Sequence, residues 1–186
     1  MPVKKTITKE AVLNSAIEVL RKHGEEGLNA RAIASYMEIS TQPIYSLFGN
    51  MEETYRQLTK EAEKRYYAWQ KEYLSKNLVS DYKAYGMAFI RFSAEEKQLF
   101  KFIFMRSKDK QHANEPQKTQ DVVVEIICKT YGVDVATAKK FHDLMSVFSF
   151  GLATLINCGV VKYDEEEVSK SLTEQFNALS GLYLKK

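Results

Sequence analysis

A short polar stretch of the chain carries side chains that could bind the edges of DNA bases. The segment STQPIYSLFGN contains Thr41, Gln42, Pro43, Tyr45 and Ser46. A glutamine amide can form two hydrogen bonds with adenine, and a threonine or proline can contact the methyl group of thymine. Hydroxyl groups such as those of Tyr45 and Ser46 can bind phosphate oxygens. These residue types predict recognition of double-stranded DNA, and the alternative is an ordinary polar helix surface.

These side chains need a short helix whose first turn faces outward. We expect this helix over residues 41–48, with Ser40 as its N-cap. Pro43 then lies in the first turn, where a missing amide hydrogen costs little because no intrahelical acceptor exists there. Ile44 and Phe48 are expected to turn inward, which leaves the polar side chains outside.

Two further helices are predicted before this one. The first covers residues 8–23, and the second begins after Asn29, which is a favourable N-cap residue. Arg31 in the first turn of the second helix and the backbone amides behind Asn29 could bind phosphate groups of the other strand. The candidate DNA-binding residues are therefore Asn29, Arg31, Ser40, Thr41, Gln42, Pro43, Tyr45 and Ser46. Three helices, of which the last two are short and joined by a tight turn, have the proportions of a helix-turn-helix.

Residues 8–58 resemble the DNA-binding domain of the TetR family of bacterial transcriptional regulators. The resemblance rests on the segments AVLNSAIEVLRKHG, LNARAIASYMEIS and TQPIYSLFGNMEETY. It implies a homodimeric repressor that binds a palindromic operator in double-stranded DNA and is released by a small-molecule effector. It also divides the chain into a DNA-binding domain, residues 1–50, and a helical effector-binding and dimerisation domain, residues 51–186.

Two positions depart from the family pattern. Glu38 stands where the turn usually has glycine, so either this residue adopts a left-handed conformation or the turn is built differently. Met51 stands where the family often has a lysine that binds phosphate. DNA affinity is then either lower or carried by Lys4, Lys5 and Lys9 near the N-terminus.

The remainder of the chain is predicted to be helical as well. Apolar residues recur at helical spacing, and almost no stretch shows the alternation of a strand. The predicted helices cover residues 51–76, 79–93, 95–107, 117–131, 134–158 and 164–184, with a loop at SKDKQHANEP. Asn50, with Glu53 three residues later, is the expected cap of the first of these helices. The sequence therefore predicts an all-α fold with about nine helices.

Aromatic residues are dense in this region, which favours a pocket for an apolar or aromatic effector. The alternative is that the rings simply fill the helical core. The candidate pocket residues are Tyr66, Trp69, Tyr85, Phe89, Phe92, Phe104 and Phe141.

The resemblance also implies that the last two long helices pair with those of a second subunit in a four-helix bundle. The candidate residues for this dimer interface are Phe148, Leu152, Leu155, Leu172, Phe176 and Leu179.

Composition and motifs limit the other functions. The chain has 27 Lys and Arg against 24 Asp and Glu, so overall charge gives little support to nucleic-acid binding. No metal-ligand spacing, phosphate-binding loop or nucleophile motif occurs, so we expect no metal, no cofactor and no enzymatic activity. A helical small-molecule-binding or enzymatic protein without sequence-specific DNA binding stays open as the alternative.

Two features bear on location. The two cysteines are too few for a disulfide scaffold, and the N-terminus lacks an apolar signal segment, so we expect a cytoplasmic protein. Residues 144–161 form an uncharged run long enough to consider a membrane span. Its polar residues and glycines favour a buried helix instead, so we expect no membrane partner.

Overall fold

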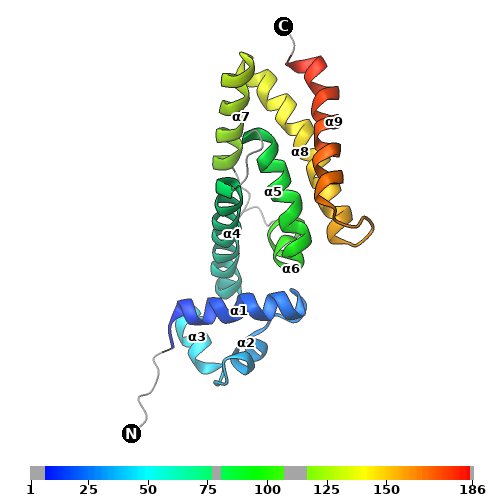
Figure 1. Cartoon of the computed structure of the whole chain (residues 1–186). Coiled ribbons are helices and arrows are strands. Elements are labelled where there is room, and N and C mark those ends of the chain that lie inside the picture. Colours follow the sequence, from blue (N-terminus) through cyan, green and yellow to red (C-terminus); the bar gives the residue numbers. More distant parts are fainter. Residues whose placement is uncertain (1–6, 77–80, 107–116, 185–186) are drawn as a thin grey trace. The chain divides into compact units, whose positions relative to one another are not determined.

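The computed structural model describes residues 7–76, 81–106 and 117–184, in which helices are joined by short turns (Figure 1). The α-helices are α1 (Lys9–His23), α2 (Ala30–Tyr36), α3 (Gln42–Phe48), α4 (Met51–Lys76), α5 (Asp81–Glu95), α6 (Lys97–Phe100), α7 (Gln117–Tyr131), α8 (Val135–Asn157) and α9 (Glu165–Tyr183), with a π-helical turn, η1 (Lys101–Met105). No strand occurs in these ranges. The prediction of an all-α fold with about nine helices is confirmed for them.

The chain divides into two compact units. The first comprises Met1–Ala68 and Glu96–Arg106, and the second comprises Trp69–Glu95 and Ser107–Lys186. Helix α4 therefore begins in the first unit and ends in the second. These units are defined by packing, whereas the boundary expected after residue 50 separates a DNA-binding from an effector-binding domain. That functional boundary stays a prediction.

The core of the first unit joins its three N-terminal helices to α4 and α6. Apolar residues at helical spacing bury one face of each helix, and the fully buried ones include Ile17, Leu20, Ile33, Ile44 and Leu58. Helix α1 begins where the Thr8 hydroxyl accepts a hydrogen bond from the Ala11 amide at 3.1 Å. It ends at Gly24, whose φ of 69° few other residues adopt.

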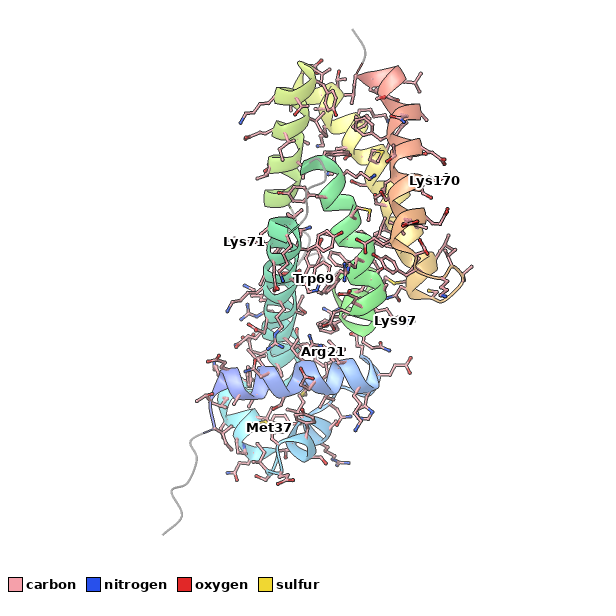
Figure 2. The ribbon with its side chains drawn as sticks, viewed as in Figure 1. Arg21, Met37, Trp69, Lys71, Lys97 and Lys170 are labelled. Atoms are coloured by element: carbon pink, nitrogen blue, oxygen red, sulfur yellow. The ribbon has the colours of Figure 1, made fainter. Side chains whose placement is uncertain are left out.

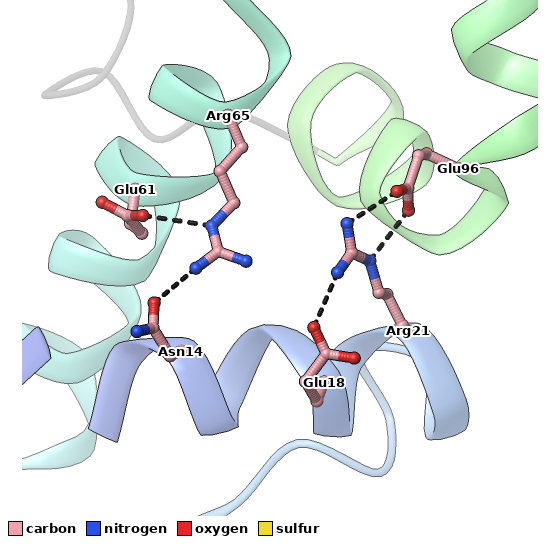
Figure 3. A network of polar contacts seen from close by, with 6 residues as sticks. All are labelled: Asn14, Glu18, Arg21, Glu61, Arg65 and Glu96. Carbon is pink, nitrogen blue, oxygen red and sulfur yellow. Dashed lines mark hydrogen bonds and ion pairs between the residues drawn. The ribbon is translucent and has the colours of Figure 1, made fainter. Parts of the chain in front are cut away.

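Polar contacts hold α1 to other helices of the first unit (Figure 3). The Arg21 guanidinium pairs with Glu96, which precedes α6. Arg65 on α4 donates to the Asn14 side chain on α1 and also pairs with Glu61 at 3.1 Å. Helix α1 is thus held at two points along its length.

The second unit packs α5 against α8 and α9, and Figure 1 shows α8 and α9 side by side. Its fully buried residues include Ala88, Ile90, Ile127 and Phe141. The Asn157 side chain, at the end of α8, donates to the Ser93 carbonyl at 2.9 Å. The last carbonyls of a helix have no intrahelical partner, so this bond satisfies one carbonyl of α5.

One predicted helix was wrong. A continuous helix was expected over residues 95–107, whereas the chain leaves helical geometry at Glu96, with φ −115° and ψ 55°. It then forms the four-residue α6 and the π-helical turn η1, after which Arg106 is extended. The π-helical turn has buried Phe102 and Ile103. Apolar spacing alone does not distinguish this interrupted path from a regular helix.

The other helix ends agree with the prediction to within about two residues. The predicted loop at residues 107–116 lies outside the described residues. Within the ranges that are described, no helix has the length and apolar character needed to cross a lipid bilayer. The uncharged run at 144–161 is instead the second half of α8 and the turn after it.

Candidate nucleic-acid interface

Helix α3 presents its polar side chains on one exposed face. Ile44 and Phe48 are buried in the first unit, at 0% and 5% exposure. Gln42, Tyr45 and Ser46 are exposed, and the Tyr45 ring is 45% accessible. Their spacing is i, i+3 and i+4, which places the three side chains together on the helix surface. Helix α3 therefore offers an amide and two hydroxyl groups to a partner.

The start of α3 differs from the prediction. Ser40 was expected to be the N-cap, but the N-cap position is Thr41, and no side chain caps the helix. Thr41 already has helical angles, φ −74° and ψ −16°, rather than the extended backbone of a capping residue. Its carbonyl accepts from the amides of Ile44 and Tyr45, at 3.1 and 3.3 Å. Because Pro43 has no amide hydrogen, this turn has one donor fewer to satisfy.

Helix α2 begins at the predicted N-cap, and a short connecting turn joins it to α3. The Asn29 side chain accepts from the Ala32 amide at 3.0 Å, and its amino group donates to the Gly27 carbonyl at 3.3 Å. Because both ends of the Asn29 amide are bound within the chain, its role is to begin the helix. Arg31 is exposed in the first turn and free to face a partner.

The end of α2 exposes a ring that the sequence analysis missed. Tyr36 is 54% exposed. Tyr36 lies just outside the narrow apolar face of α2, which is formed by the buried residues Ala30, Ile33 and Ala34. Its position relative to that face is the sequence signal that could have identified it as exposed.

The turn between α2 and α3 adopts the first of the two predicted alternatives. Glu38 has φ 56°, a left-handed conformation that is uncommon for a residue with a side chain. The amide of Glu38 donates to Ser35, and the next amide, of Ile39, donates to Ala34. The turn thus keeps the hydrogen bonds of a helix end with glutamate in place of glycine.

Helix α4 begins at a side-chain cap and is bound to the start of α2 by one hydrogen bond. Asn50 caps α4 by accepting from the Glu53 amide at 2.8 Å, as the sequence predicts. The Tyr55 hydroxyl donates to the Leu28 carbonyl at 2.8 Å, directly before the cap of α2. The Tyr55 contact therefore ties α4 to the start of α2.

The predicted pocket residues belong to several ring clusters. In the first unit, Tyr66 contacts Phe104 edge to face at 5.0 Å. In the second unit, Trp69 of α4 (Figure 2) has its ring centre 5.4 Å from that of Phe92. Tyr66 and Phe92 are buried. Both contacts fit the alternative that these rings fill the core.

Three other pocket candidates also lie in the second unit. Phe89 contacts Phe150 at 6.1 Å, and Tyr85 is half-buried on α5. Phe141 is fully buried and contacts Phe176 at 5.3 Å. The candidates with accessible surface in this unit are therefore Trp69, Tyr85 and Phe89.

A shallow hollow of about 550 Å³ lies in the first unit, and none of the predicted pocket residues lines it. It is lined by the turn after α1 and by the segment of α6 and η1. Arg106 borders it, pairs with Glu25 at 3.3 Å and lies 4.7 Å from the centre of the Phe102 ring. Residues of both charges, two glutamates and two basic residues, therefore line this hollow.

The predicted dimer residues differ in exposure. Leu155 is 44% exposed, whereas Leu172 is only 3% exposed and lies against Gly86 of α5. The ring of Phe176 contacts those of Tyr82 and Phe141 within the unit. Phe148, Leu152 and Leu179 are half-buried.

Solved structures share this fold across the chain. One is a TetR-like transcriptional regulator from Rhodococcus sp. RHA1, with a TM-score of 0.69, 14% identity and coverage of 98% of this chain and 100% of that one. Another, a protein of unknown function from Rhodococcus sp. RHA1, has a TM-score of 0.75, 16% identity and full coverage of both chains. A third is the multidrug binding protein EbrR complexed with imidazole, with a TM-score of 0.55, 14% identity and coverage of 92% and 96%.

Comparison with protein-family models gives no match, and comparison with curated protein sequences gives none either. The structural likeness nevertheless covers nearly the whole chain. The chain has the fold of TetR-type transcriptional regulators, and the resemblance seen in residues 8–58 is confirmed at the level of the fold.

Proposed function

We propose that the protein is a homodimeric transcriptional repressor that binds a palindromic DNA operator and is released by a small apolar or aromatic effector. The observation that carries this proposal is the exposed face of α3, with Gln42, Tyr45 and Ser46 outward and Ile44 and Phe48 buried. A short helix with this exposure can enter the major groove, where each base pair presents a distinct pattern of donors and acceptors.

The side chains at this surface have separate proposed roles. Gln42 reads an adenine through its amide, and Thr41 and Pro43 contact bases or the thymine methyl group. Tyr45, Ser46 and Arg31 bind phosphate groups and so set the position of the helix on DNA. Ser40 lies directly before the N-cap of α3, and Asn29 is the N-cap of α2. Both are proposed to lie against the DNA backbone, where the amides behind Asn29 bind phosphate.

The proposed dimer interface is the exposed face of α8 with the end of α9. On α8, Val147 is 73% exposed, Phe150 is 40% exposed and Leu155 is 44% exposed. Gly151 lies on the same face, and a methyl group there would meet nothing within 4 Å. Leu182 on α9 is 76% exposed. Apolar side chains around a glycine favour close approach of a second helix pair, as in four-helix bundles.

The proposed interface includes only some of the dimer residues predicted from the sequence. Leu155 is retained, and the half-buried Phe148, Leu152 and Leu179 contribute at its edge. Leu172 and Phe176 are assigned to the core of the subunit, because their side chains already pack within it.

The proposed effector contacts are the accessible aromatic residues of the second unit, Trp69, Tyr85 and Phe89. Half-buried rings offer apolar area and ring faces to an aromatic ligand. One protein with this fold is named as a multidrug binding protein and was solved with imidazole. This supports an effector of small aromatic character for the present chain.

Selection of duplexes from a random DNA pool tests the proposal. The purified protein is incubated with the pool, bound duplexes are sequenced, and affinities are measured by fluorescence anisotropy at two salt concentrations. Enrichment of an inverted repeat, with affinity that falls steeply as salt rises, is the expected result. The alternative, a helical small-molecule-binding protein, predicts no enrichment and equal affinity for all duplexes.

A further inference from the structure

The hollow beside the end of α1 combines charged side chains of both signs with apolar surface. Its volume of about 550 Å³ lies within the range of roughly 300–1,000 Å³ that is usual for small-molecule pockets. The turn after α1 contributes Glu25 and Glu26, and the segment that runs through α6 and η1 contributes Lys101 and Arg106. These residues all belong to the first unit, whereas the proposed effector contacts belong to the second.

The Arg106 guanidinium is held in position but is incompletely bonded. It lies 4.7 Å from the centre of the buried Phe102 ring, and this contact restricts its motion. Within the described residues, it donates to Glu25 at 3.3 Å and to the Thr59 hydroxyl at 3.5 Å, both longer than the usual limit of about 3.2 Å. Because a guanidinium group has several N–H donors, Arg106 keeps donors for a further acceptor.

The acidic side chains of the hollow are available as well. Glu25 is 40% exposed, and its single hydrogen bond comes from Arg106. Glu26 and Lys101 are exposed, and neither forms an ion pair in the part of the chain that the structure describes. A ligand with one charge would therefore meet repulsion as well as attraction in the hollow. A ligand with both charges can match both signs.

The hollow also has an apolar part. Met105, which is 39% exposed, borders it, and a flexible thioether side chain adapts to ligands of irregular shape. Gln98 lines the hollow next to the turn after α1, since its amide oxygen lies 3.1 Å from the place that a side-chain carbon on Gly24 would take. A ligand can thus contact a charged pair and an apolar side chain at once.

We propose that this hollow binds a small zwitterion with an apolar side chain, which is the chemistry of an apolar α-amino acid. The carboxylate of the ligand binds Arg106, because a planar carboxylate can accept two hydrogen bonds from a guanidinium group. The ammonium group of the ligand binds Glu25, which keeps a charged partner when Arg106 binds the ligand. The apolar side chain lies on Met105. This inference goes beyond the proposed function and does not depend on it, because no residue of the site belongs to α3 or to the proposed effector contacts.

NMR titration of the nitrogen-labelled full-length protein with L-phenylalanine tests this inference. Gly24 lines the hollow, so its amide resonance reports binding there. Two matched probes each lack one charge: phenylpropionate has no ammonium group, and phenethylamine has no carboxylate. Each should bind roughly 10- to 100-fold more weakly than L-phenylalanine, because a hydrogen bond between charged groups is lost.

Variants test the two named contacts. Arg106→Gln and Glu25→Gln should each weaken the binding of L-phenylalanine by roughly 10- to 100-fold. Lys22→Gln is the control, because Lys22 is an exposed residue in the last turn of α1 that does not line the hollow. Melting temperatures show whether the variants are folded. The comparison of the three probes uses the wild-type protein, so it holds even where a variant does not fold.

The outcomes separate this inference from the proposed function. Equal affinity of L-phenylalanine and phenylpropionate would assign the hollow to simple acids and overturn the zwitterion. A Gly24 shift that is absent with L-phenylalanine, or that is unchanged in folded Arg106→Gln, would overturn the site itself. Failure of the wild-type protein to bind any duplex would contradict the proposed function and leave this site standing.

Discussion

Arg21 and Glu96, 75 residues apart in the sequence, form a two-point ion pair in the first unit (Figure 3). The Nε and Nη2 atoms of Arg21 lie 3.0 and 2.6 Å from the two carboxylate oxygens of Glu96. Their side chains are 36% and 23% exposed, so solvent partly screens the attraction. The pair joins the last turn of α1 to the start of α6.

A double-mutant cycle with Arg21→Gln and Glu96→Gln should give a coupling free energy of about 0.5–1 kcal/mol, in the upper range for exposed pairs because the geometry is bidentate. Urea denaturation of the four proteins measures it. The Arg21–Glu18 pair, one turn apart on α1, provides a comparison expected to be weaker. A coupling free energy near zero would show that solvent screening removes the attraction between Arg21 and Glu96.

Replacement of Glu38 by glycine should stabilise the protein. Glu38 holds φ 56°, where a side chain costs roughly 1–2 kcal/mol, and glycine removes this cost while it adds some entropy to the unfolded chain. We expect a net gain of about 0.5–1 kcal/mol in the free energy of unfolding. Glu38→Ala, which keeps the side-chain carbon that causes the strain, is the control and should show no such gain.

Gln42→Ala should lower discrimination between the selected operator and random DNA by about 1–3 kcal/mol, because a two-point contact with adenine is lost. Tyr45→Phe should weaken binding to both duplexes equally, because its hydroxyl is assigned to phosphate. Competition between operator and random duplexes, followed by anisotropy, measures both effects. Wild-type behaviour of both variants would rule out α3 as the recognition helix.

Leu155→Glu should convert the proposed dimer to a monomer, because it places a charge in the apolar face of α8. Sedimentation velocity at several protein concentrations detects the change. Val122→Glu is the matched control, since Val122 is 49% exposed on α7, outside the proposed interface. If the two variants sediment alike, the interface lies elsewhere.

His142 should make the second unit less stable in mild acid. Burial lowers the pKa of this residue, while the charge of Asp143 acts in the opposite direction. The unfolded chain then takes up a proton near pH 6.5, whereas the folded protein does so only at lower pH. The free energy of unfolding should therefore fall as the pH drops from 6.5 to the lowered pKa.

Urea denaturation above and below pH 6.5 measures this effect. His142→Gln should reduce the loss of stability in acid. Ser146→Ala removes the hydroxyl that lies 3.4 Å from the ring but keeps the imidazole, so it should retain the loss. An equal acid dependence in the wild-type protein and His142→Gln would contradict the prediction.

Local features of the chain were predictable because neighbouring residues produce them. The caps at Thr8, Asn29 and Asn50 each depend on a side chain and an amide three residues later, so the sequence contains both partners. The left-handed backbone at Glu38 was one of two stated alternatives. The outward face of α3 follows from the spacing of its two buried residues.

Features that depend on distant contacts were not predictable in this way. The break at Glu96 occurs where α6 packs against α1, and the π-helical turn follows it; no local spacing signals either. Leu172 and Leu155 look alike in the sequence, yet one packs on α5 and the other faces outward. Choosing between core and surface for such residues requires the position of the neighbouring helices.

The hydrogen bond from Asn157 to the Ser93 carbonyl also constrains how α8 can move. A shift of α8 along its axis by one turn would separate the Asn157 amide from the Ser93 carbonyl. Each buried group would then lack this hydrogen bond, which costs about 1–3 kcal/mol for each group. Sliding of α8 against α5 is therefore unfavourable. A slide of α8 along α5 must first break this bond, so the bond opposes relative motion of the two helices.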